Sequence, residues 1–282
     1  MVFFLCIAVV SVTTGCGGGT GTDDDVDTAT YTAESDTLSD LMGRFLGYRV
    51  LNQLSTYKQM VDTSYSIEHF SEGLSATLDR RHPQEYVYGV SMGIKMSRDI
   101  MALENEGINL NRANILELVG KNITPTAEVI ESDLQKTSNA FDNLATRAAA
   151  LGPGNVSGQM IDSLENVYAS LVGKMANSDI ARYIETEQKE FDTMRFIAGI
   201  ERIVSEKKPL EYIYGAFQST SLEQQIGLTE KKGVNIKRDK LLESMREVLR
   251  LNAVDTAEFN KLSTELGSFL NRIYKESPEM DL

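Results

Sequence analysis

An internal repeat is the feature that most constrains how this chain can fold. Residues 85–123 return 126 positions later as residues 211–249, and 11 of the 39 aligned positions are identical without a gap. The same offset holds without a gap from Leu41 to Leu249, and it pairs Tyr86 with Tyr212. The chain is therefore an internal duplication, and its two halves are expected to have the same fold.

A cluster of helix-breaking residues marks the boundary between the halves. Residues 151–158 read LGPGNVSG, which is the richest concentration of Gly and Pro in the body of the chain. We expect a linker at 151–158, a first helical domain at 39–150 and a second at 159–276.

The N-terminus resembles an export signal. Residues 1–15 contain the short apolar stretch of a signal peptide, and Cys16 follows a small residue as it does in a bacterial lipobox. Lipidation at Cys16 would anchor the protein to the bilayer through acyl chains. The alternative is an ordinary signal peptide with an incidental Cys. Residues 17–37 contain nearly no apolar residues and carry a net negative charge, so we expect residues 16–38 to form a disordered tether of roughly 25 Å behind the lipidated Cys16. The predicted location is the bacterial envelope, at the outer membrane on its periplasmic side or the cell surface.

Four expected helices each carry two small residues spaced by four. Small side chains at this spacing share one helix face and let two backbones cross closely. Because a Gly inside a helix costs about 1 kcal/mol relative to Ala, their recurrence indicates a packing requirement. The pairs are Gly43 and Gly47, Gly89 and Gly93, Ala169 and Gly173, and Gly215 and Ser219.

The remaining pattern is helical throughout, and we predict an all-α fold. Apolar residues recur at helical spacing, and no alternating pattern of convincing length predicts a strand. Turns are expected at Gly107 and Gly233, where Gly can adopt positive φ at a helix end. Third helices are expected to begin at Thr126 and Thr256 in the two halves.

The composition argues against several functions. With 28 Lys and Arg against 41 Asp and Glu, the net charge of −13 repels a phosphate backbone, so we expect no nucleic-acid partner. His69 and His82, the only histidines, have no Cys or organised carboxylates at metal-ligand spacing, and we expect surface or packing roles for them. No motif for a phosphate loop or a serine nucleophile is present. We therefore predict no metal, no cofactor and no catalytic residue.

The repeated motif resembles a known helical domain. Tyr-x-Tyr-Gly-x-x-x-Gly, a stretch of helix, Gly-Ile/Val-Asn-Leu/Ile and a second helix are similar to the N-terminal dimerisation domain of FKBP-type prolyl isomerases of the macrophage infectivity potentiator kind. The resemblance covers residues 86–144 and 212–274, with shortened relatives at 39–79 and 167–205. The second-helix Gly of the family is Gly73 or Gly199 in the shortened units, whereas Leu118 and Ser244 replace it in the others.

The resemblance implies an arrangement and a role. In that family the helical domain pairs two chains, holds unfolded clients between its arms and precedes a β-rich catalytic domain, for which we see no counterpart here. We therefore expect tandem FKBP N-terminal-like domains in a monomer with an internal pseudo-dimer, acting as a non-enzymatic chaperone or scaffold for unfolded or envelope clients. The alternatives are a structural interaction lipoprotein without client binding, an accessory subunit of a prolyl isomerase and, third, a catalytic isomerase. Candidate client contacts are Tyr86, Tyr88, Tyr212 and Tyr214, although such tyrosines more often belong to the core with their hydroxyls at its rim.

Overall fold

The computed structural model describes residues 33–60, 65–125, 130–231, 234–251 and 253–276. Over these residues the chain forms ten helices and no strand, which confirms the predicted all-α class. The helices are α1 (Ala33–Met60), α2 (Ile67–Leu78), α3 (Gln84–Asn105), α4 (Arg112–Asn122), α5 (Glu131–Leu151), α6 (Gly158–Glu187), α7 (Thr193–Val204), α8 (Leu210–Glu230), α9 (Arg238–Leu249) and α10 (Thr256–Glu276).

The sequence repeat is visible as a repeat of helices. The first half contributes α1 to α5, and the second half contributes their equivalents α6 to α10 in the same order. The helices α2, α3 and α4 begin 126 residues before α7, α8 and α9, which is the offset found in the sequence. The helix α5 ends at Leu151 and α6 begins at Gly158, so the breaker cluster joins the two halves.

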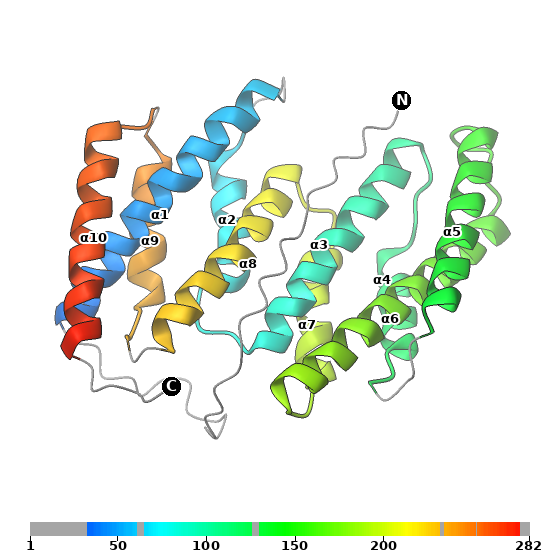
Figure 1. The fold of residues 1–282 in the computed structure, drawn as a ribbon. Coiled ribbons are helices and arrows are strands. Elements are labelled where there is room, and N and C mark those ends of the chain that lie inside the picture. The colour runs from blue at the N-terminus through cyan, green and yellow to red at the C-terminus, as the bar shows by residue number, and fades with distance from the viewer. Residues whose placement is uncertain (1–32, 61–64, 126–129, 232–233, 252, 277–282) are drawn as a thin grey trace.

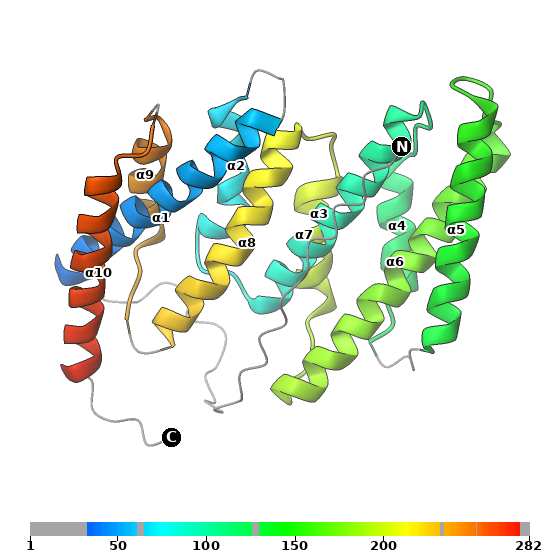
Figure 2. The same cartoon turned by 45° about the horizontal axis from the view of Figure 1, so that its top comes forward.

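The helices do not follow one another in space as they do in the chain. Packing contacts run through the molecule in the order α10, α1, α9, α2, α8, α3, α7, α4, α6, α5, as Figure 1 and Figure 2 show. The contact between α8 and α3 lies at the middle of this row. Moving outward from it, the helices on one side are the repeat equivalents of the helices on the other side, in the same order. The row of helices is therefore elongated and pseudo-symmetric about the contact between α3 and α8.

Each end of the row has its own hydrophobic core, and each core combines both halves. One core is built mainly from α1 and α2 of the first half with α8, α9 and α10 of the second. The other is built mainly from α3, α4 and α5 of the first half with α6 and α7 of the second. The sequence halves 39–150 and 159–276 thus interlock, and each core needs helices from both.

Local sequence explains where several helices begin. Ser66, Asn111, Ser157 and Asp192 each precede a helix, and their side-chain oxygens accept hydrogen bonds from backbone N–H groups of the first turn. Gly107 has φ of 80° where the chain leaves α3, as the expected turn requires.

Two side chains tie the halves together at helix starts. Glu165 of α6, although 2% exposed, accepts a hydrogen bond from the backbone N–H of Asn111 at 2.6 Å, just before α4. At the equivalent place in the other core, Ser39 of α1 accepts one from the backbone N–H of Lys237 at 2.8 Å, just before α9. Each bond satisfies a backbone donor that a helix start leaves unpaired.

One helix boundary differs from the prediction. The helix α1 begins at Ala33, so the last residues of the expected tether are helical. The reason is packing, because Leu38 is 1% exposed and belongs to a core. Thr256 begins α10 as expected, whereas the expected start at Thr126 lies outside the described residues and α5 is described from Glu131.

Candidate functional site

The centre of the molecule is built from two close helix crossings. At the crossing of α3 with α7, a Cβ added to Gly199 would lie 2.9 Å from the Cα of Gly89. At the equivalent crossing of α8 with α2, a Cβ added to Gly215 would lie 3.1 Å from the Cα of Gly73. At both places the two helix backbones touch, so each long helix packs against a short helix of the opposite half.

The other predicted small residues belong to further crossings of the same kind. Gly43 and Gly47 of α1 face Leu241, Met245 and neighbouring residues of α9, and Gly93 of α3 faces Ile200 of α7. Gly173 of α6 lies against Asn122 at the end of α4. Ala169 and Ser219 are 0% exposed. The small faces of α3 and α8 therefore meet the shorter helices α7 and α2.

The four predicted tyrosines are packed rather than displayed. Tyr212 is 5% exposed, and Tyr86, Tyr88 and Tyr214 are half-buried. The ring of Tyr86 stacks on His82 with centroids 4.1 Å apart. Burial raises the pKa of the Tyr86 and Tyr212 hydroxyls. These contacts match the packing role that we kept open for these residues.

Two equivalent aromatic clusters flank the central crossings. In one, Phe191 lies 5.2 Å from Tyr183 and 5.5 Å from Phe196 between ring centroids. Tyr88 meets Tyr183 edge-on at 5.9 Å. The equivalent cluster joins Tyr65 to Phe70 at 6.0 Å and Phe70 to Tyr214 at 5.9 Å. Such pairs add to the apolar burial of each crossing.

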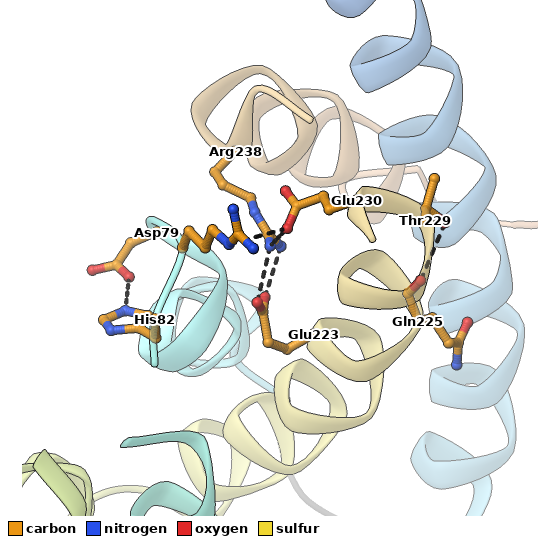
Figure 3. Close-up of polar contacts among 8 residues, drawn as sticks. Asp79, His82, Glu223, Gln225, Thr229, Glu230 and Arg238 are labelled. Atoms are coloured by element: carbon orange, nitrogen blue, oxygen red, sulfur yellow. Dashed lines mark hydrogen bonds and ion pairs between the residues drawn. The ribbon is translucent and has the colours of Figure 1, made fainter. Parts of the chain in front are cut away.

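A buried ion cluster joins α8 to α9, and sequence inspection did not single it out. Arg238, 5% exposed, donates to Glu223 at 2.7 and 2.9 Å and to Glu230 at 3.0 Å (Figure 3). Arg81, from the connection between α2 and α3, reaches Glu230 at 3.8 Å. Burial raises the pKa of Glu223 to about 7, although Arg238 opposes the shift. The repeat has an Arg at both 112 and 238 and a Glu at both 104 and 230. This conservation between the halves was the sequence signal that could have identified the cluster.

Neither histidine has a metal-ligand environment. His82 hydrogen-bonds Asp79 at 2.6 Å in the connection between α2 and α3, as Figure 3 shows. Burial acts to raise the pKa of Asp79, but the hydrogen bond and charge of His82 outweigh it and lower the value. His69 is exposed on α2. Over the described part of the chain, no group of three or more His, Cys, Asp or Glu could hold a metal ion.

Two open grooves lie at equivalent ends of the row. One, of about 580 Å³, lies between α1 and α10; the other, of about 350 Å³, lies between α5 and α6. Leu41 lines the first groove, and its repeat equivalent Val167 lines the second. The first is lined by Thr37, Leu41, Thr264, Glu265, Ser268, Phe269 and Arg272, and the second by Lys136, Thr137, Ala140, Asn166, Val167 and Ser170.

Cys16 and the predicted signal peptide lie outside the described residues. None of the helices in the described ranges is both long and apolar enough to cross a bilayer. Comparison of the chain with family models, with curated proteins and with solved structures finds no match.

Proposed function

We propose that this chain is a lipid-anchored envelope protein whose helical body serves as a non-catalytic binding scaffold in protein folding. The observation that carries the proposal is the interlocking of the halves through the crossings of α3 with α7 and α8 with α2. The FKBP-type domains that the sequence resembles pair two chains. Here one chain supplies both partners, and two lobes extend from the shared centre.

The surface supports a scaffold for defined partners better than a holder of many unfolded clients. A chaperone of the second kind needs a contiguous apolar surface. Among the described residues, the exposed large apolar side chains are instead spread over α5, α7, α8 and the loops near α5 and α9. They are Ile130, Leu151, Met194, Leu210, Leu228 and Leu251.

The grooves are the candidate partner sites under this proposal. The groove between α1 and α10 combines apolar Leu41 and Phe269 with polar Thr37, Ser268 and Arg272. An apolar groove that also presents a few polar groups suits a specific partner, because the polar groups favour one orientation.

A pull-down from envelope extracts with the helical body as bait tests the proposal. Ser268→Arg places a large charged side chain in the groove and should reduce capture of the specific partner at least tenfold. Ser263→Arg is the matched control, because Ser263 is exposed on the same helix but does not line the groove. Equal capture by both variants would exclude this groove as the partner site.

Two assays separate the scaffold from its alternatives. The body should not suppress aggregation of a denatured model protein at equimolar concentration, because its apolar side chains are dispersed. It should also not accelerate isomerisation of a proline-containing peptide. Suppression of aggregation would favour the chaperone. Peptide catalysis that is lost on mutation of the chain would favour the isomerase.

A further inference from the structure

The buried ion cluster has an equivalent in the other core, with one substitution. Arg112 and Glu104 lie 126 positions before Arg238 and Glu230, and Arg112 donates to Glu104 at 2.7 Å. The position of Glu223, however, is taken by Ser97. One carboxylate of the first cluster therefore has no counterpart in the second.

Two buried polar groups at this place lack a hydrogen-bond partner. The side chain of Arg112 is 10% exposed, and its Nη1 has no hydrogen-bond partner. Ser97 is 0% exposed, and its Oγ also has no partner. In the first cluster the same nitrogen of Arg238 donates to Glu223 at 2.7 Å. The two unpaired groups are thus the equivalents of Glu223 and of the Arg238 nitrogen that pairs with it. Buried donors of this kind normally have hydrogen-bond partners.

The two clusters also differ in how many carboxylates pair with their cations. Arg238 and Arg81 are matched by two carboxylates, Glu223 and Glu230. In the second cluster, Arg112 and Lys207 share one carboxylate, Glu104, with Lys207 at 2.8 Å from its Oε2. Lys207 is exposed, so the buried comparison is between the two guanidiniums: Arg112 has one carboxylate partner, whereas Arg238 has two.

Neighbouring acidic groups do not replace the carboxylate that is missing at Ser97. Asp99, on the same helix as Ser97, accepts a hydrogen bond from Tyr168 at 3.0 Å. Glu165 accepts hydrogen bonds from the backbone of Asn111 and the side chain of Asn114. Among the described residues, no ion pair joins either carboxylate to Arg112.

We propose that Arg112 Nη1 and Ser97 Oγ bind a small monovalent anion, chloride or a formate-like carboxylate, at the position equivalent to the Glu223 carboxylate. Both groups can donate hydrogen bonds to an anion. Replacement of Glu by Ser removes about three heavy atoms, which suits a chloride or formate ion rather than a larger anion. One carboxylate of the first cluster has no counterpart here, which agrees with a single negative charge on the ligand.

Thermal unfolding in different sodium salts at constant ionic strength tests the site. Relative to gluconate, chloride or formate should raise the Tm of the wild-type protein, by about 3–5 °C for each tenfold increase above half-saturation. A response to chloride alone would assign a halide site, and a response to formate alone a carboxylate site. Equal Tm values in all three salts would overturn the proposal.

The repeat provides matched variants. Ser97→Glu supplies the missing carboxylate covalently and should abolish the salt response, whereas Glu223→Ser creates a second site and should increase it. If Ser97→Glu does not fold, Ser97→Ala removes only the hydroxyl and should raise the half-saturating chloride concentration. A chloride response unchanged in Ser97→Ala, or retained in a folded Ser97→Glu protein, would show that the anion binds elsewhere.

Discussion

The crossing of α3 with α7 leads to a sharp prediction about a single methyl group. A Cβ added to Gly89 would overlap the carbonyl oxygen of Phe196 and would lie 2.9 Å from its carbonyl carbon. These atoms belong to the backbone of α7, so no side-chain rotation can relieve the overlap. Gly89→Ala therefore requires the two helices to move apart.

The size of the effect follows from two opposing contributions. Replacing a helical Gly by Ala stabilises the helix by about 1 kcal/mol. Overpacking of a tight interface costs about 1–3 kcal/mol or more, and backbone overlap falls at the upper end because a whole helix must shift. We expect a net loss of about 2 kcal/mol in the free energy of unfolding, which lowers Tm by about 4–8 °C in a domain of this size.

Urea and thermal unfolding followed by circular dichroism at 222 nm measure this loss. Gly227→Ala is the control, since Gly227 is also helical but nothing lies within 4 Å of an added Cβ. It should be more stable than wild type by up to 1 kcal/mol. Gly215→Ala, at the equivalent crossing, should be destabilised about as much as Gly89→Ala. If Gly89→Ala proved as stable as Gly227→Ala, the close backbone contact would be wrong.

Three further predictions concern charge, topology and location. Because burial raises the folded pKa of Glu223 to about 7, from the ordinary value of 4.5, the folded protein keeps a proton that the unfolded chain has lost. The free energy of unfolding should therefore fall as pH rises between these values. Glu223→Gln should flatten this dependence, whereas the exposed Glu243→Gln should not, and equal slopes would contradict the assignment. Cleavage at a protease site inserted within residues 152–157 should leave the halves together at single-chain mass in sedimentation equilibrium, since each core contains both; separation or a doubled mass would refute the interlocked monomer. Cys16→Ala should release the protein from the membrane fraction, and continued fractionation with membranes would refute the lipid anchor.

The helices themselves could be predicted from the sequence because the signals are local. Apolar spacing, the Gly107 turn and the breaker cluster at 151–158 are read from neighbouring residues, and the helices begin and end close to them. Because of the repeat, the pattern of a helix could be compared with that of its equivalent in the other half. The start of α1 could not be predicted, because Leu38 follows an acidic, Thr-rich stretch and only its burial in a core extends the helix upstream.

The partner of each helix is a different matter. Small residues at a spacing of four indicate a close crossing, but they do not specify the second helix. Gly89 meets Gly199, and Gly215 meets Gly73, only because the halves interlock. The ion cluster was missed for a related reason, since Glu223 and Arg238 lie on different helices and their pairing depends on how α8 meets α9.

The connections at Pro83 and Pro209 show how the sequence favours interlocking over two separate domains. Each proline immediately precedes a long helix, with φ of −58° and an extended ψ of 150° or 153°. A proline at this position cannot continue the preceding helix, and the extended backbone directs the next helix away from it. The helices α2 and α3 therefore make few mutual contacts, and each packs mainly on a helix of the other half. Because both halves belong to one chain, each meets the other at an effective concentration of about a millimolar. This favours pairing of α2 with α8 and of α3 with α7 within one molecule.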